Sequence, residues 1–133
     1  MLMGAYKYIL QSFAKTTAER GDILRKRLQE WRSQPPVIRI EKPTNPARAR
    51  EIGYKAKKEI VVIRVRVHKG KRTRRKPNMG RKPGKNVKRV SMAKPLSWMA
   101  TQKALRKHTN LALVGSYKAA TDGDSEYFEV ILR

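Results

Sequence analysis

Residues 60–67 read IVVIRVRV, which is the clearest β-strand pattern in the sequence. Side chains alternate between the two faces of a strand, so the four apolar residues at 61, 63, 65 and 67 share one face. The opposite face carries Ile60 and Val62, followed by Arg64 and Arg66. The alternation therefore predicts a strand with one face in the core and an opposite face that is half cationic.

The segment after this strand, residues 68–90, has a very different composition. From Lys69 to Arg89 it contains 11 Lys or Arg, and its only sizeable apolar side chains are Met79 and Val87. Two prolines and three glycines interrupt it. So little apolar surface cannot offset the entropy of ordering the chain. We therefore predict a long basic extension that becomes ordered only against a partner.

Regular structure is predicted again after Pro95, which suits the first turn of a helix. Residues 96–108 carry apolar side chains at helical spacing and end in cations, which suit the C-terminal end of a helix. Residues 111–117 and 126–132 alternate as strands, and TDGDS at 121–125 is typical of a turn between them.

Residues 1–31 read as two helices, because apolar side chains recur at helical spacing on either side of Gly21. Two prolines at 35 and 36 end the second helix. Residues 37–40 then fit a short strand, and residues 43–54 are turn-rich and basic.

Together these elements predict an α+β fold: a small antiparallel sheet with packed helices, N-terminal helices and a long basic loop. We divide the chain into an N-terminal helical segment, residues 1–34, and an α/β core, residues 35–133. The basic extension, residues 68–90, interrupts the core. The order of the strands in the sheet does not follow from these patterns.

The charge of the chain is strongly one-sided. It has 33 Lys plus Arg against 10 Asp plus Glu, which gives a net charge of +23. No acid stands between Glu59 and Asp122, while that stretch holds 18 Lys or Arg. Solvated surfaces normally mix the two signs. A solvated tail or a nuclear-import patch would also be basic, but here the cations span a strand face, a loop and a helix end. We therefore expect a polyanionic partner, and nucleic acid fits best.

Several other classes of protein fit the sequence poorly. The chain has no cysteine, which excludes disulfides and thiolate metal sites. No stretch approaches the roughly 20 apolar residues that span a bilayer, so a membrane is not an expected partner. His68 and His108 have no nearby acid to orient them. We therefore predict that the chain is not an enzyme and has no small-molecule substrate.

One cluster of acidic residues has the spacing of metal ligands. Asp122, Asp124 and Glu126 have the spacing that begins a calcium-binding loop. However, Tyr127 stands where such a loop needs Gly, and Arg133 stands where it needs Glu. We therefore predict a turn at this position, with neither a metal nor another cofactor.

Aromatic side chains could add base recognition to phosphate binding. Single-stranded RNA is recognised largely by stacking of its bases on aromatic rings. Tyr6, Tyr8 and Tyr54 lie beside lysines and are the better stacking candidates. Most other aromatic residues fit the apolar stripes of the predicted helices and strands, so a place in the core is the simpler interpretation for them.

Several motifs resemble one known family. Residues 4–9 read GAYKYI, residues 49–57 read AREIGYKAK, and residues 61–70 read VVIRVRVHKG. Near the C-terminus, GSY at 115–117 and YFEVIL at 127–132 follow. In this order and over nearly the whole chain, these motifs resemble the archaeal and eukaryotic type of the fifteenth large-subunit ribosomal protein. The signature is built around A-R-x-[LI]-G-Y-K-A-K and R-[IV]-R-V-x-[KR]-G.

The resemblance implies an α/β core with an antiparallel sheet and basic segments threaded through large-subunit rRNA. It implies neighbouring ribosomal proteins as further partners, a place in the cytoplasmic ribosome and no catalytic role. By motif position, Arg48, Arg50, Lys55, Arg64 and Arg66 fall in the signature, and residues 71–89 fall in the loop that wraps rRNA.

The chain departs from the family pattern in three places. Ala47 and Glu59 stand where the family usually has an acid and a glycine, and Glu59 would alter the turn into the strand. Family members also continue past residues 129–132 with another basic segment, whereas this chain stops at Arg133. The resemblance thus implies a lost C-terminal extension or a shortened form.

We therefore predict a structural constituent of the large ribosomal subunit that stabilises rRNA by neutralising phosphates and inserting its loop. The alternative is a general nucleic-acid packaging or RNA-chaperone protein. The predicted RNA-binding residues are Tyr6, Lys7, Tyr8, Arg48, Arg50, Tyr54, Lys55, Lys57, Arg64, Arg66, Lys69, Lys71, Arg72, Arg74, Arg75, Lys76, Arg81, Lys82, Lys85, Lys88 and Arg89.

Overall fold

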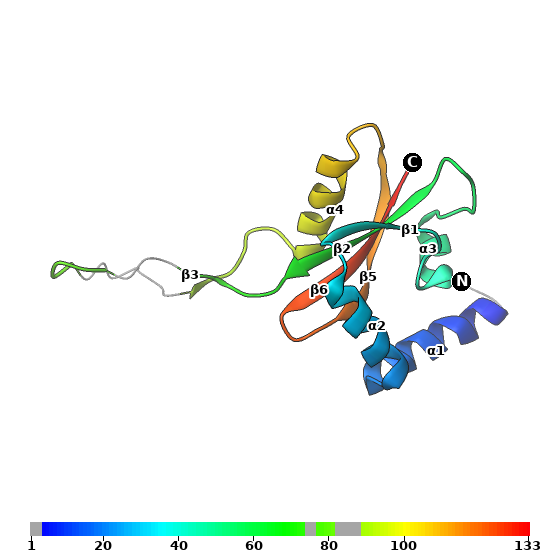
Figure 1. The fold of residues 1–133 in the computed structure, drawn as a ribbon, viewed down its shortest axis with the longest axis horizontal. Coiled ribbons are helices and arrows are strands. Elements are labelled where there is room, and N and C mark those ends of the chain that lie inside the picture. The colour runs from blue at the N-terminus through cyan, green and yellow to red at the C-terminus, as the bar shows by residue number, and fades with distance from the viewer. Residues whose placement is uncertain (1–3, 74–76, 82–88) are drawn as a thin grey trace.

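A computed structural model describes residues 4–73, 77–81 and 89–133 of the chain (Figure 1). In chain order its elements are α1 (Ala5–Glu19), α2 (Asp22–Ser33), β1 (Val37–Ile40), α3 (Pro46–Ile52), β2 (Val61–His68), β3 (Arg72–Thr73), β4 (Arg89–Val90), α4 (Leu96–Lys107), β5 (Leu113–Thr121) and β6 (Ser125–Leu132). The predicted α+β class is confirmed.

A four-stranded antiparallel sheet forms the centre of the fold, in the order β1-β2-β6-β5. The predicted strand, β2, lies inside this sheet and pairs with β6 along its whole length, from Val61 opposite Leu132 to His68 opposite Ser125. The predicted turn joins β5 to β6, where the Asp122 amide donates to the Ser125 carbonyl at 2.8 Å. The many β-branched residues of β2 pack well on this pleated surface, where Val62, Ile63, Val65 and Val67 are buried.

Helix α4 covers one face of the sheet. The odd-numbered apolar side chains of β2, which include the fully buried Ile63 and Val65, pack there against Ala100 and Ala104. Both alanines have no exposed surface. Their small side chains let the helix approach the sheet closely. The predicted inner face of β2 and the predicted helix after Pro95 are thus confirmed.

The opposite face of the sheet is covered as well, which the strand pattern did not predict. Helix α2 packs Leu24, Leu28 and Trp31 against Tyr127 and its neighbours. The Trp31 and Tyr127 rings meet with their centroids 5.2 Å apart at an interplanar angle of 58°. This face of β2 carries Arg64 and Arg66, as the strand pattern predicted, but α2 covers Arg64, whose side chain is only 12% exposed.

Helix α3 was not predicted, since residues 43–54 were expected to be turn-rich. Asn45 caps the helix by accepting the Arg48 amide at 3.1 Å, and Pro46 occupies its first turn. Gly53 ends it with φ at 111°, a conformation that glycine adopts without strain. A helix of seven residues has too few positions for a periodic pattern to be recognised.

The basic extension begins as a short antiparallel hairpin. Arg72 pairs with Val90 and Thr73 with Arg89, which joins β3 to β4. Residues 77–81 lie far out along the extension, well away from the sheet (Figure 1). Met79, one of the two sizeable apolar residues of the extension, is 90% exposed.

Candidate nucleic-acid interface

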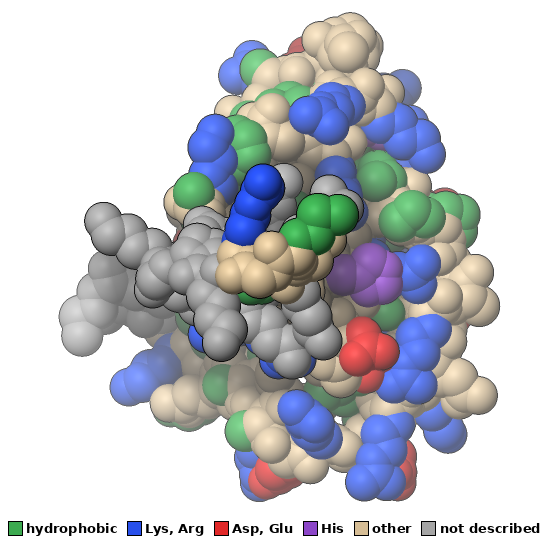
Figure 2. Space-filling view, turned by 90° about the vertical axis from the view of Figure 1, so that its left-hand side faces the viewer, with side chains coloured by type: hydrophobic (Ala, Val, Ile, Leu, Met, Phe, Trp, Pro, Cys, Tyr) green, Lys and Arg blue, Asp and Glu red, His purple; other side chains and the backbone are tan. Residues whose placement is uncertain are grey.

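The first group of predicted residues lies on the extension and at its root. The Lys69 amide donates to the Asp124 carbonyl at 2.8 Å, which ties the root to the turn between β5 and β6. Lys71, Arg81 and Arg89 are exposed. Figure 2 looks onto this end of the molecule, where Lys and Arg side chains are spread over the visible surface and acidic ones are few. We call Lys69, Lys71, Arg81 and Arg89 the extension cluster.

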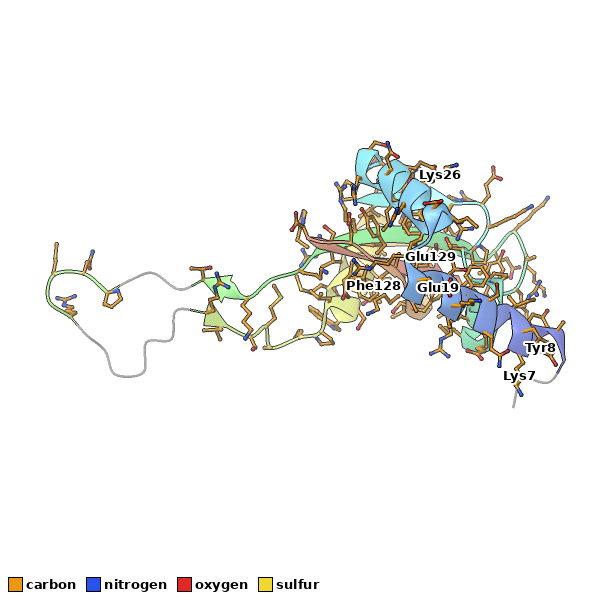
Figure 3. The ribbon with its side chains drawn as sticks, turned by 90° about the horizontal axis from the view of Figure 1, so that it is seen from below. Lys7, Tyr8, Glu19, Lys26, Phe128 and Glu129 are labelled. Atoms are coloured by element: carbon orange, nitrogen blue, oxygen red, sulfur yellow. The ribbon has the colours of Figure 1, made fainter. Side chains whose placement is uncertain are left out.

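A second group forms where α1 meets α3 and the loop after it. The Arg50 guanidinium donates to the Tyr6 hydroxyl and lies 5.3 Å from the centre of the Tyr6 ring. The two residues are 44 positions apart in the sequence, so only the fold brings them together. Lys7 and Tyr8 lie at the free end of α1, and Tyr8 is 70% exposed (Figure 3).

The remaining members of this second group follow on or after α3. Arg48 is exposed but pairs with Glu51 at 2.5 Å, so part of its charge is neutralised within the chain. Lys55 and Lys57 are exposed in the loop after α3. Tyr54 is half-buried against the core cluster that contains Ile131, which leaves less of its ring for stacking. We call these residues, with Tyr6, Lys7, Tyr8 and Arg50, the α1–α3 cluster.

Arg64 lies inside the protein, although the strand pattern placed it on a cationic surface. Its side chain is 12% exposed, and its Nε is 3.7 Å from a carboxylate oxygen of Glu129. Its guanidinium lies 4.0 Å from the centre of the Trp31 ring and donates to Gln34 at 3.1 Å. Burial lowers the pKa of the Arg64 guanidinium, and the Glu129 carboxylate opposes that effect. All of these contacts are within the protein, so the Arg64 side chain is part of the interior of the fold.

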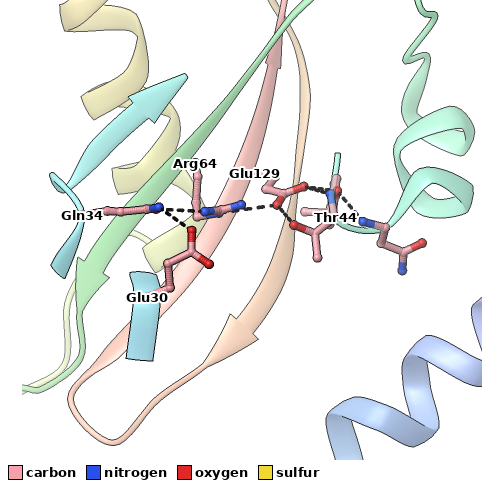
Figure 4. A network of polar contacts seen from close by, with 7 residues as sticks. Glu30, Gln34, Thr44, Arg64 and Glu129 are labelled. Carbon is pink, nitrogen blue, oxygen red and sulfur yellow. Dashed lines mark hydrogen bonds and ion pairs between the residues drawn. The ribbon is translucent and has the colours of Figure 1, made fainter. Parts of the chain in front are cut away.

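Glu129 is the other half of this internal ion pair and has no exposed surface. It accepts hydrogen bonds from the Thr44 amide at 2.9 Å and from the hydroxyls of Thr44 and Tyr117. Figure 4 shows its carboxylate between Arg64 on one side and Thr44 on the other. Burial, followed by the Glu129 charge, raises the pKa of Tyr117 far above its ordinary value. The network joins α2, the loop before α3 and three strands.

Arg66 also has an intramolecular contact, since it donates to the Arg32 carbonyl at 2.8 Å. Unlike Arg64 it forms no ion pair among the residues that the structure describes. Arg32 itself makes a two-pronged contact with Asp122 at 2.6 and 2.8 Å. The hydrogen bond from Arg32 holds the pKa of Asp122 below its ordinary value.

Two kinds of feature are absent from the residues that the structure describes. Among residues 4–73, 77–81 and 89–133, no three acidic or histidine side chains gather where they could hold a metal ion. Of the suspected calcium ligands, Asp122 is engaged by Arg32, and Glu126 lies 3.8 Å from Lys118. In the same ranges, no helix is long and apolar enough to cross a membrane.

The comparison with known families agrees with the resemblance found in the motifs. Residues 4–133 match the family model described as ribosomal L15. The chain belongs to the ribosomal L15 family. It is similar to the large ribosomal subunit protein eL15 of Metallosphaera sedula, with 45% identity over 133 residues. That match covers 99% of this chain and 61% of the relative, so the chain spans about three fifths of the length of that protein.

For this ribosomal L15 family chain, the structure places most of the described RNA-binding candidates in two clusters, and Arg66, which contacts the Arg32 carbonyl, lies outside both. The extension cluster and the α1–α3 cluster lie toward opposite ends of the molecule (Figures 1 and 3). Arg64 belongs to neither, because its side chain is internal. Outside the described residues lie Arg74, Arg75, Lys76, Lys82, Lys85 and Lys88, together with the side chain of Arg72.

Sequence reasoning missed one exposed aromatic side chain in this family member. Trp98 lies on α4 and is 41% exposed, with the Lys94 ammonium 3.7 Å from the centre of its ring. Its neighbours at 96, 99 and 100 belong to the apolar stripe of the helix. Position 98 falls off that stripe at helical spacing, and this offset was the signal that could have identified it.

Proposed function

We propose that this chain is a structural component of the large ribosomal subunit, where it binds rRNA and contacts neighbouring ribosomal proteins. In this role it neutralises phosphates at both clusters and inserts its extension between RNA segments. The proposal draws on family membership, on the +23 charge and on the way that charge is distributed over the fold.

The pairing of acidic side chains is the observation that carries the proposal. Glu129 is buried against Arg64, and Glu51, Asp122 and Glu126 each face a cation within the chain. By contrast, the extension cluster makes no ion pair within the described part of the chain. The extension itself, residues 68–90, contains no acidic residue. Its cations are thus left for an external polyanion.

Binding of this kind has a physical signature. Each phosphate that a Lys or Arg neutralises releases a condensed counterion, so affinity falls steeply as salt rises. Two clusters at opposite ends of the molecule allow contact with two separate RNA segments at once. Such contacts position the protein and hold RNA segments together but do not read base identity. This matches a structural role, not a sequence-reading one.

Sedimentation tests the proposal directly. The tagged protein is run from cell extract through a high-salt sucrose gradient, with and without RNase treatment. We expect it to move with the large subunit at near-equal stoichiometry and to leave only after RNase treatment. Protein that stays at the top, or spreads over all nucleic acid and washes off with salt, would instead support a general packaging or RNA-chaperone protein.

A further inference from the structure

A groove lies between the root of the extension and the start of α4, apart from the α1–α3 cluster. Its volume is about 1210 Å³, and its walls come from the end of β2, from β3, from residues 90–94 and from α4. Pockets that enclose a small molecule are smaller, at roughly 300–1,000 Å³. The volume of the groove is thus larger than that of a typical small-molecule pocket.

The lining of the groove combines exposed apolar surface with positive charge. Trp98 and Met92 are 41% and 42% exposed, and both lie in it. Its walls also carry four lysines, at positions 69, 71, 94 and 103, and no acidic residue. A flat apolar ring among cations matches a ligand that has flat apolar parts joined by negative charges. An unpaired stretch of nucleic acid has this chemistry.

We propose that this groove binds a single-stranded segment of rRNA, with one unpaired base stacked on the Trp98 indole. The phosphates on either side of that base lie against Lys94 and Lys69. Bases within a duplex are stacked on one another and cannot reach the ring, so the ligand is single-stranded. The inference rests on the proposed function and adds to it a point of contact with a base.

Lys94 already occupies the position that the base would take. Its ammonium lies 3.7 Å from the centre of the indole ring, and the residue is exposed. A cation–π contact at an exposed site is weak, and an exposed side chain changes rotamer rapidly. The base therefore displaces the ammonium from the ring, and the ammonium pairs with a neighbouring phosphate. Lys103 is held at the β2 wall by its hydrogen bond to the Arg66 carbonyl at 3.3 Å.

Tryptophan fluorescence on the full chain tests this inference. The chain has two tryptophans, of which Trp31 is 4% exposed and Trp98 is 41% exposed, so a ligand in the groove quenches mainly the second. We expect oligoadenylate to quench the emission. We expect Trp98→Ala to weaken its binding about tenfold, or about 1.4 kcal/mol, and Trp98→Phe to keep most of the affinity. Ile23→Ala, an exposed apolar residue on α2, is the matched control and should change nothing.

The salt dependence separates the base contact from the phosphate contacts. Trp98→Ala should leave the salt slope unchanged, whereas Lys94→Gln should reduce it by about 0.7 for one lost single-strand phosphate contact. An abasic oligomer of the same length should bind the wild type and Trp98→Ala equally, which would support the stacking contact.

Two outcomes would overturn the inference. In the first, oligoadenylate binds but the tryptophan emission is not quenched. In the second, Trp98→Ala binds oligoadenylate as tightly as the wild type does. A protein segment as the natural occupant of the groove predicts both. If either occurs while the wild type still sediments with the large subunit, the groove assignment fails and the proposed function stands. If the wild type fails to sediment with the subunit, the proposed function itself fails.

Discussion

Replacing Arg64 with methionine should destabilise the fold and leave its electrostatic attraction to RNA almost unchanged. Methionine keeps most of the aliphatic stem, so the packing of that stem is largely retained. What is lost is the guanidinium, which lies 3.7 Å from Glu129, 3.1 Å from Gln34 and 4.0 Å from the centre of the Trp31 ring. Glu129 would then be a buried carboxylate without a cation.

The size of the effect follows from that uncompensated charge. Removing one partner of a buried ion pair costs about 3–5 kcal/mol. Glu129 keeps the Thr44 amide and the hydroxyls of Thr44 and Tyr117 as hydrogen-bond donors, which places the expected loss near the lower end, at about 3 kcal/mol. Whole domains are stable by only about 5–15 kcal/mol, so this is a large share of the total.

Urea unfolding followed by far-ultraviolet circular dichroism measures this loss. The double variant Arg64→Met, Glu129→Gln removes the buried charge and should recover more than half of it. Arg39→Met, on an exposed arginine of the neighbouring β1, is the matched control and should stay within about 0.5 kcal/mol of the wild type.

If Arg64 instead contacts a phosphate of the RNA, the opposite results are expected. Such a contact predicts a nearly unchanged free energy of unfolding and a salt slope of rRNA binding that falls by about 0.9. A loss of stability below about 1 kcal/mol, or a double variant no more stable than the single one, would refute the reasoning from burial.

Three further predictions concern other parts of the fold. The lowered pKa of Asp122 means that its contribution to stability is present above its unfolded pKa and is lost as pH falls through its folded pKa. Acid titration of unfolding should therefore be flatter for Asp122→Asn than for the wild type at about pH 4 and below. Gly115→Ala would place a methyl group 2.2 Å from the Ile52 side chain. Thermal unfolding should reveal a loss of about 1–3 kcal/mol from this overpacking, and an unchanged midpoint would mean that α3 moves aside freely. Replacing Lys71 and Arg89 together with Ala should lower the salt slope of rRNA binding by about 1.8 in filter-binding titrations. A slope equal to that of the wild type would show that the base of the hairpin is not part of the RNA interface.

Much of the architecture was predictable because it depends on local patterns. Strand β2 follows from an alternation with period two, and the turn at 121–125 follows from Asp and Gly between two such patterns. The basic extension follows from composition, because a segment with so few apolar side chains cannot join a core. The prediction of a polyanionic partner follows from net charge, which does not depend on the fold.

Other features depend on contacts between distant parts of the chain. An alternating pattern divides β2 into two faces but does not say what covers the second one, and α2 covers Arg64 there. The Arg50–Tyr6 contact and the groove beside Trp98 likewise join residues that are far apart in sequence. The amino-acid sequence thus determined the strands, the main helices and the excess of positive charge, each of which is a property of neighbouring residues or of composition. Only the tertiary structure decided which cations face outward, because burial depends on where the other elements pack.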